Sequence, residues 1–240
     1  MAQTSIITFD GKLDNLVGFK NNKGTYSLRK RIKPANPNTI QQRAQRAKFT
    51  AVSKLEQLLR PQLFGLKPAA NQDKISLRNE FMKLNIGVCE NVGMEDGGFK
   101  VQLLYDNVTV AKGNGRPISK PQFQADIPGT VIFTYSANSL GDSDLDDPVH
   151  LVGIIGDMER VYHAQAKRRD GQLALENLPA NTAGKTMTLY HFTQHFNTPA
   201  AQAVYDSYLS TNQAEAIGWL FESASNSIFS NSNVGRVTLS

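Results

Sequence analysis

Cysteine is almost missing from the sequence: the chain of 240 residues has only one, Cys89. A single cysteine excludes an intrachain disulfide framework and a thiolate zinc cluster. Long apolar runs are also missing, because stretches such as Leu151–Ile155 fall far short of the roughly 20 residues of a membrane-spanning helix. The first residues, Met1–Ile7, lack the charged and apolar blocks of a signal peptide. We therefore expect a soluble chain that does not span a membrane and is not secreted by a signal peptide.

The composition is sufficient for a folded core. Hydrophobic residues make up 40% of the chain and charged residues 20%, which excludes a wholly disordered protein. A length of 240 residues fits one large domain or two small ones, because domains commonly have about 100–200 residues.

The net charge of +5 hides an asymmetry along the chain. Residues 1–70 hold 13 basic and 3 acidic residues, a net of +10, whereas residues 71–240 hold 13 basic and 18 acidic residues, a net of −5. This division indicates a basic part that meets phosphate or an acidic protein surface, joined to an acidic globular part. The alternative is a solvated surface whose lysines only prevent aggregation at sheet edges.

The N-terminal residues predict a β-hairpin followed by helices. Strand-like residues 15–20 and 25–31 flank the turn Asn21–Gly24, and alternation in the second strand places Arg29 and Arg31 on one basic face. After the prolines of 34–37, Thr39 and Gln42 match a capping box that begins a helix ending before Pro61. A second, shorter helix is expected around 76–85.

From about residue 98 the pattern is typical of β-structure. Short runs of β-branched, aliphatic and aromatic residues alternate with glycine and proline turns, which favours a sandwich over a doubly wound parallel sheet. The expected strands are 99–105, 107–112, 130–136, 149–155, 160–166, 172–175, 186–193 and 204–209. The sequence thus predicts a mainly β (α+β) fold: an Ig-like or similar antiparallel β-sandwich, preceded by a basic β-hairpin and one or two helices. The predicted parts are a docking segment at 1–96, the sandwich at 97–210 and a Ser/Asn-rich C-terminal arm at 211–240.

Motifs for phosphate or calcium binding are incomplete. Gly184-Lys185-Thr186 resembles the end of a phosphate-binding loop, but Pro179 stands where glycine is needed and a strand-like run follows, so we expect a turn before a strand. The four aspartates within 142–147 alternate as in a calcium loop, but they lack its glycine and its final glutamate. We expect a solvated loop there, with a weak surface cation site as the alternative.

The sequence carries no recognisable catalytic signature. His191 and His195 have the spacing of a helical zinc pair, but four residues of strand separate them by roughly 13 Å, too far for one metal ion. No nucleophile elbow occurs, and a lone cysteine such as Cys89 is more commonly a buried thiol. We therefore predict a protein that is not an enzyme and has neither cofactor nor metal.

The basic N-terminal stretch is the feature best suited to binding. Its cations would engage phosphates or acidic side chains while Tyr26 stacks on a base, although no sequence-specific recognition motif accompanies them. The alternative is a charged surface that faces water. The candidate docking residues are Lys20, Arg29, Lys30, Arg31, Lys33, Arg43, Arg46 and Lys48.

Several stretches along the chain form a distinctive set. They are Gly11-Lys12, the stretch Asn15–Lys20, Gly24, Tyr26, Arg29, the motif within 36–49 that contains Asn36, Pro37, Thr39, Gln42, Gln45, Arg46 and Phe49, the Asp146-Asp147-x-Val149 run, and Val204–Leu209. Together they resemble a domain family of unknown function, about 200 residues long, found in bacterial and phage genomes, and this analogy says nothing about chemistry. The resemblance spans roughly residues 10–210. It implies a basic hairpin and helix before a β-sandwich, and a virion or assembly component, with no catalytic residues to transfer.

Three functions follow as hypotheses. The first is a phage structural protein in the virion, made in the host cytoplasm, that forms homo-oligomers and docks through its basic segment on other virion proteins or packaged nucleic acid. The second is an adhesive or carbohydrate-binding sandwich, with Tyr105, Tyr135, Tyr190 or Trp219 as the stacking platform, although strands favour burial of such rings. The third is non-specific nucleic-acid binding.

Overall fold

The chain forms two compact units, Met1–Ile40 and Gln41–Ser240. The computed structural model describes residues 11–13, 16–20, 26–30, 38–60, 77–95, 98–113, 115–138, 144–156, 159–196, 203, 227–230 and 232–240.

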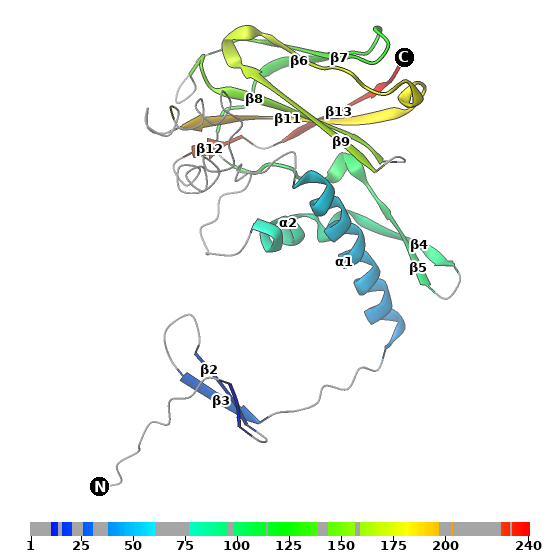
Figure 1. The fold of residues 1–240 in the computed structure, drawn as a ribbon, viewed down its shortest axis with the longest axis vertical. Helices are drawn as coiled ribbons and strands as arrows, with labels where there is room; N and C mark the ends of the chain where they lie inside the picture. Colours follow the sequence, from blue (N-terminus) through cyan, green and yellow to red (C-terminus); the bar gives the residue numbers. More distant parts are fainter. Residues whose placement is uncertain are drawn as a thin grey trace. The chain divides into compact units, whose positions relative to one another are not determined.

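The first unit contains a three-stranded antiparallel sheet, drawn in blue in Figure 1. Its strands are β1 (Gly11–Leu13), β2 (Leu16–Lys20) and β3 (Tyr26–Lys30), in the order β1-β2-β3. The pairing of β2 with β3 runs from Leu16 opposite Lys30 to Lys20 opposite Tyr26. The predicted hairpin is therefore confirmed, and a short strand extends it on the β2 side.

Both predicted helices are present in the second unit. Helix α1 (Ile40–Leu59) begins next to Thr39 and ends before Pro61, and α2 (Leu77–Asn85) leads into the 3-10 turn η1 (Ile86–Val88). Among the described helices, none is both long and apolar enough to cross a membrane.

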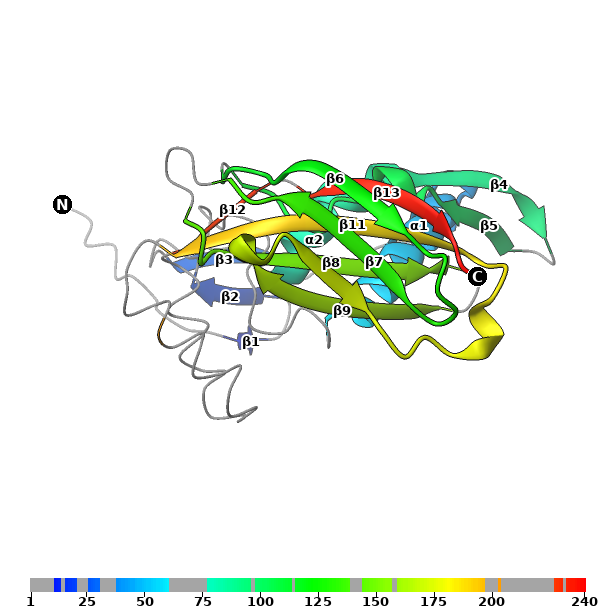
Figure 2. The same ribbon diagram turned by 90° about the horizontal axis from the view of Figure 1, so that it is seen from above.

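The β-structure is antiparallel throughout the described pairs. The strands of the second unit are β4 (Cys89–Glu95), β5 (Gly98–Leu103), β6 (Ser119–Gln124), β7 (Val131–Ser136), β8 (Pro148–Ile155), β9 (Arg160–Lys167), β10 (Gln172–Leu175), β11 (Thr186–Phe196), β12 (Ser227–Phe229) and β13 (Asn233–Thr238). One sheet has the order β12-β11-β8-β9, with β13 also paired to β11, and a second has the order β10-β7-β6. Figure 2 shows the second sheet lying across the first, while β4 and β5 form a separate hairpin.

The larger sheet is covered on both faces, which makes the second unit a three-layer structure. In Figure 1, β6 and β7 lie on one side of β8 and β11, and α1 and α2 lie on the other. Every residue of β8 is buried, so its apolar run is explained by two cores rather than one. The core between the sheets includes Val131, Phe133, Leu151, Leu173 and Leu189, and the core under the helices includes Leu55, Leu59, Val152, Ile154 and Phe192. The fold is a mainly β, antiparallel β-sandwich with helices packed on its outer face.

The predicted strand at 107–112 is wrong, because a side chain replaces a neighbouring strand there. Buried Asn85 accepts a hydrogen bond from the Thr109 N–H at 2.7 Å and donates one to the Thr109 carbonyl at 3.0 Å. The next amide, that of Val110, donates to the Ser232 hydroxyl at 3.2 Å. Side-chain groups thus satisfy backbone that a sheet would otherwise pair.

Four strands of the second unit were not expected. β4 precedes the predicted β region, and β6 contains Pro121 and a positive φ at Lys120, which are weak strand signals. β12 and β13 lie within the predicted C-terminal arm, where they pair with β11. The strand predicted at 204–209 lies outside the described residues.

Candidate docking surface

The first face of the N-terminal sheet combines lysines with exposed apolar side chains. The strand register places Leu16, Lys20, Tyr26, Leu28 and Lys30 on this face. All five are exposed, Leu28 by 49%. The Lys20 ammonium lies 5.6 Å from the centre of the Tyr26 ring, within cation–π range.

The second face carries basic residues as well. Lys12 is paired with Val17 and Val17 with Arg29, so the two cations flank an apolar side chain across the three strands. The Arg29 guanidinium lies 5.6 Å from the centre of the Phe19 ring, and Phe19 is exposed. The sheet therefore carries basic and apolar side chains on both faces, and not the one strongly basic face that the sequence predicted.

Strands β2 and β3 bury no side chain. Gly18 is the one buried residue of these two strands, and it has no side chain. A small isolated sheet is marginally stable in water and gains stability by packing its apolar side chains on another surface. No acidic residue occurs in 11–13, 16–20 or 26–30, so a matching surface would be apolar with negative charge.

The basic residues predicted on α1 do not form one patch. At about 100° per residue, Arg43 and Arg46 lie roughly 60° apart around the helix, whereas Lys48 lies on nearly the opposite side from Arg46. Lys48 is half-buried beside β4, and its carbonyl accepts a contact from the Cys89 thiol at 4.0 Å. Arg46 is exposed and Arg43 half-buried.

The eight predicted docking residues therefore fall into three groups. Lys20, Arg29 and Lys30 lie in the first unit, and Arg43, Arg46 and Lys48 lie in the second. Arg31 and Lys33 lie outside the described residues. The structure brings Lys20 and Lys30 to one face of the sheet and places Arg29 on the other.

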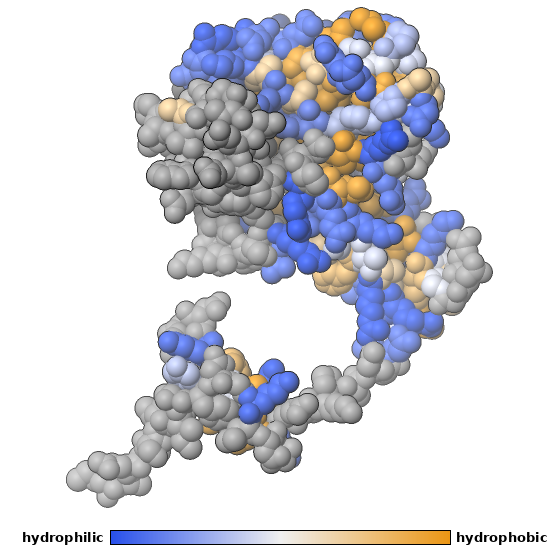
Figure 3. All heavy atoms as spheres, viewed as in Figure 1, coloured by the Kyte–Doolittle hydropathy of each residue, from blue (hydrophilic) through white to orange (hydrophobic). Residues whose placement is uncertain are grey.

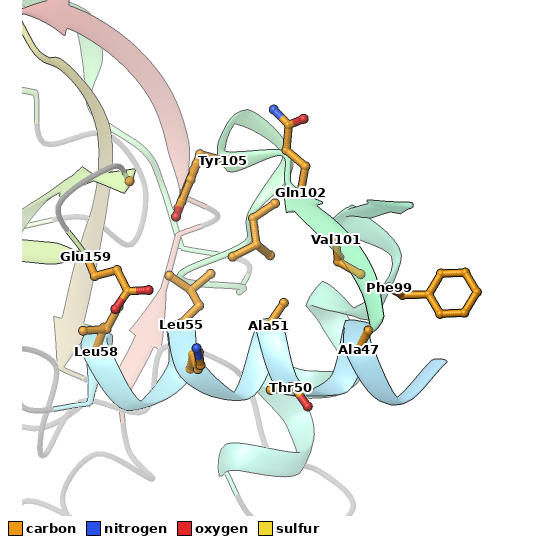
Figure 4. Close-up of a pocket in the computed structure, with 13 residues that line it drawn as sticks. Ala47, Thr50, Ala51, Leu55, Leu58, Phe99, Val101, Gln102, Tyr105 and Glu159 are labelled. Atoms are coloured by element: carbon orange, nitrogen blue, oxygen red, sulfur yellow. The ribbon is translucent and has the colours of Figure 1, made fainter. Parts of the chain in front are cut away.

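An apolar groove runs along α1 in the second unit. It has a volume of about 710 Å³ and lies between the helix and β5. Figure 4 shows Ala47, Ala51 and Leu55 aligned toward the β5 side, with Phe99 pointing away. Figure 3 shows apolar surface on this part of the second unit. The rim includes Lys54 and Glu159. No feature of the sequence predicted this groove.

A buried charged cluster was also missed from the sequence. Arg168 is only 1% exposed; its guanidinium donates to Asn138 Oδ1 at 2.7 Å and to the Arg116 carbonyl at 2.9 Å. Asp147, 4.0 Å from Arg168, accepts hydrogen bonds from His195 Nδ1 at 2.8 Å and from the Asp144 N–H at 2.7 Å. Burial raises the pKa of Asp147, although these partners oppose the shift. The expectation of a solvated loop is thus wrong at Asp147.

Three further histidines are neutral near pH 7; His150 and His191 are buried and His163 is half-buried. His150 Nδ1 lies 3.2 Å from His163 Nε2, and its Nε2 lies 3.3 Å from Gln194 Oε1. Burial lowers the pKa of His163 and of His191 to about 4, and lowers that of His150 well below its ordinary value. His191 packs against the Phe133 ring at 5.1 Å between centroids. The rings of His150 and His191 pack against core aromatic rings, and none of the three histidines lines the α1 groove.

The phosphate-loop-like motif and the lone cysteine both have structural roles in the fold. The Gly184-Lys185-Thr186 motif forms the predicted turn before a strand, β11. Cys89 is buried, and burial raises the pKa of its thiol, which keeps it protonated. Across the part of the chain that the structure describes, no group of three or more His, Cys, Asp or Glu residues could hold a metal ion.

Two of the four aromatic residues suggested as a sugar platform, Tyr135 and Tyr190, are buried. Tyr190 is fully buried, and its hydroxyl donates to the Tyr105 carbonyl at 2.6 Å. Tyr135 is buried and donates to the Lys167 carbonyl at 2.9 Å. Tyr105 is half-buried beside the α1 groove, and Trp219 lies outside the described residues.

Comparisons with known proteins add only distant structural likenesses. No protein-family model matches the chain, and no curated protein matches it. A computationally redesigned β-sandwich protein is 10% identical, with a TM-score of 0.32 over 52% of this chain and 91% of that one. The fibronectin type III domain of the human collagen alpha-1(XX) chain is 12% identical, with a TM-score of 0.29 over 54% and 84%. That of human contactin 1 is 10% identical, with a TM-score of 0.26 over 33% and 64%.

Proposed function

We propose that this protein is a non-enzymatic structural or assembly component of a phage virion, whose basic N-terminal sheet docks on partner subunits. The observation that carries the proposal is a sheet with cations and exposed apolar side chains on both faces, whose strands β2 and β3 bury no side chain. Such a sheet gains stability when a partner covers it. The sequence resemblance to a family of bacterial and phage genomes supports the virion setting.

The second unit suits a repeated building block. Its central sheet is covered on both faces, so each copy would present the same rigid surfaces to its neighbours. In this proposal the protein forms homo-oligomers, contacts other virion proteins, needs no cofactor or membrane, and enters the virion after synthesis in the host cytoplasm.

Nucleic-acid binding by the same sheet is the second candidate. Lys12, Lys20, Arg29 and Lys30 are exposed beside the exposed rings of Tyr26 and Phe19, which is the pairing of cations and aromatics that single strands favour. The apolar Leu16 and Leu28 favour protein instead, because phosphates and sugars offer them little to contact. The adhesive alternative is compatible with a β-sandwich, but two of its suggested stacking residues, Tyr135 and Tyr190, are buried.

Charge reversal in the sheet separates the two candidates. The full chain with Lys20→Glu and Lys30→Glu is compared with a matched control, Lys112→Glu and Lys120→Glu, which reverses two exposed lysines of the second unit. Light scattering measures assembled mass, and titration of labelled single-stranded DNA at several salt concentrations measures nucleic-acid affinity. If the N-terminal sheet docks on protein, the variant with Lys20→Glu and Lys30→Glu should lose assembled mass, and the control variant should not.

Tight DNA binding would instead favour the nucleic-acid function. Four phosphate contacts would give a slope of roughly −3 in the logarithm of affinity against the logarithm of salt concentration, at about −0.7 per contact for single strands. A wild-type chain that stays monomeric and is absent from purified particles would contradict the structural role.

A further inference from the structure

A second groove of the second unit lies between α1 and α2 and has a volume of about 440 Å³. Its walls carry two exposed cations, and no acidic residue lines it. We call this surface the α1–α2 groove. Its lining residues are Phe49, Thr50, Ser53, Lys54, Gln57, Arg78 and Met82.

The groove combines apolar and positively charged side chains. Phe49 is 48% exposed, and Met82 is half-buried. Arg78 Nη2 donates to Ser53 Oγ at 2.9 Å, which holds the guanidinium of α2 against α1. Lys54 is exposed and makes no hydrogen bond or ion pair with a described residue. A partner that fits this surface would present an apolar side chain together with negative charge.

A turn on the opposite side of the unit has a fixed conformation. Residues 126–130 join β6 to β7, and the Thr130 amide donates to the Ile127 carbonyl at 3.1 Å. Gly129 has a φ of 72°, and its carbonyl accepts a hydrogen bond from the Leu178 amide at 3.0 Å. Because the turn is held in place before binding, little conformational entropy would be lost when it docks.

The turn carries the chemistry that the groove requires. Ile127 is 53% exposed and follows Asp126 in the chain. Leu175 pairs with Val131 at the start of β7, so Glu176 lies beside the same turn. Both carboxylates are exposed, and neither makes a hydrogen bond or ion pair with a described residue. We call residues 126–130 together with Glu176 the acidic turn.

The other exposed large apolar side chains of the described second unit match the groove less well. Outside the groove itself, these side chains are Met94, Ile127, Leu145 and Val234. Lys100 and Arg236 stand beside Met94 and Val234, so those surfaces carry the same charge as the groove. Asp146 beside Leu145 already accepts a hydrogen bond from Lys167. Ile127 is therefore the apolar side chain with available negative charge next to it.

The acidic turn and the α1–α2 groove of one copy cannot meet. The turn joins β6 and β7, which lie on one side of the central sheet, whereas α1 and α2 lie on the other (Figure 1). Layers of this kind are spaced about 10 Å apart, so the central sheet keeps the turn roughly 20 Å from the helices. The occupant of the groove must therefore come from another molecule.

We propose that the acidic turn of one copy enters the α1–α2 groove of a second copy. Ile127 then contacts Phe49, and the two carboxylates of the turn face Lys54 and Arg78. The contact is head-to-tail, so its repetition builds a ring or a filament. The inference rests on the proposed assembly function, for which it names a contact between identical copies that does not involve the N-terminal sheet.

Charge reversal on either side of the contact tests the proposal. All variants are made in the chain with Lys20→Glu and Lys30→Glu, called the parent, so that docking through the N-terminal sheet does not contribute. The groove variant adds Lys54→Glu and Arg78→Glu, and the turn variant adds Asp126→Lys and Glu176→Lys. Each should weaken self-association in sedimentation equilibrium roughly tenfold or more, because attraction becomes repulsion. The matched control, Lys112→Glu and Lys120→Glu, changes two exposed lysines that line neither surface and should associate as the parent does.

An equimolar mixture of the two variants separates a lost contact from a lost fold. In the mixture, the lysines of the turn variant meet the glutamates of the groove variant. The native turn of the groove variant also meets the native groove of the turn variant. Opposite charges then face each other at both kinds of contact, so association should return to that of the parent.

Three results would overturn the inference: a monomeric parent, a turn variant that associates as the parent does, or a mixture that stays dissociated. A groove variant that loses affinity for single-stranded DNA while its self-association is unchanged would also overturn it, and would assign the groove to nucleic acid. Docking through the N-terminal sheet is judged separately, from the assembled mass of the wild type against that of the parent.

Discussion

Replacing Arg168 with methionine should be among the most damaging single substitutions in the second unit. Its guanidinium is buried, with one hydrogen bond to Asn138 at 2.7 Å, one to the Arg116 carbonyl at 2.9 Å, and Asp147 at 4.0 Å. Methionine keeps most of the apolar stem but none of these contacts. The substitution therefore leaves the Asp147 carboxylate buried without its cation.

The expected loss in the free energy of unfolding follows from the Asp147 carboxylate, which stays buried after the substitution. Removing one member of a buried ion pair costs about 3–5 kcal/mol, mainly because the other charge stays buried. For a domain of this size 1 kcal/mol corresponds to about 2–4 °C, so the Tm should fall by roughly 6–20 °C. Part of this loss should be recovered by Asp147→Asn, since a neutral side chain no longer needs a cation.

Chemical denaturation of the full chain measures the free energy of unfolding, and the neighbouring residue supplies the control. Arg169 is half-exposed and pairs with exposed Asp146, so Arg169→Met should cost less than about 1 kcal/mol. The reasoning fails if Arg168→Met and Arg169→Met cost the same. It also fails if Asp147→Asn is as costly in the Arg168→Met protein as in the wild type, because the two residues would then not be coupled.

Three further predictions concern the same unit. Asn85→Ala should lower the free energy of unfolding by about 2–4 kcal/mol in urea denaturation, because the Thr109 N–H and carbonyl both lose their partner; a loss below 1 kcal/mol would contradict this. Burial lowers the pKa of His163 and His191 to about 4, so between pH 6.5 and 4 the unfolded chain binds protons that the folded chain does not. Stability should therefore fall as the pH drops, by about 2 kcal/mol per histidine at pH 5, and an unchanged urea midpoint would refute it. The Cys89 thiol should react with a thiol reagent only after unfolding, as followed by absorbance; rapid reaction of the native protein would show that it is accessible.

Local patterns predicted the elements whose signals are contained within a few residues. The capping residue Thr39 and the stop at Pro61 bracketed α1 closely, and turn chemistry between 20 and 26 identified the hairpin. Alternation alone was misleading at 107–112, because the partner of Thr109 is the Asn85 side chain, 24 residues away in the sequence. No local pattern reports a contact of that kind.

The sequence identified the basic residues of the candidate docking surface but not the faces on which they lie. Sequence located the basic residues of the N-terminal sheet, whereas only the strand register shows that Lys20 and Arg29 lie on opposite faces. Lys48 likewise required the helical rotation that separates it from Arg46. Arg168 gave no signal, because a buried arginine cannot be told from an exposed one without the groups that surround it. The pairing of β12 and β13 with β11 joins segments more than 30 residues apart, in a tail whose composition suggested an arm.

Docking through the N-terminal sheet is tested most directly by the assembled mass of the full chain with and without an apolar contact. Leu28→Asp places a charge on an exposed position of β3 that supports no core within the described sheet, so the fold of the second unit should be unaffected. Light scattering at physiological salt should show a wild type heavier than the monomer and a Leu28→Asp variant with a lower assembled mass. Equal masses for the two proteins would contradict docking through this surface.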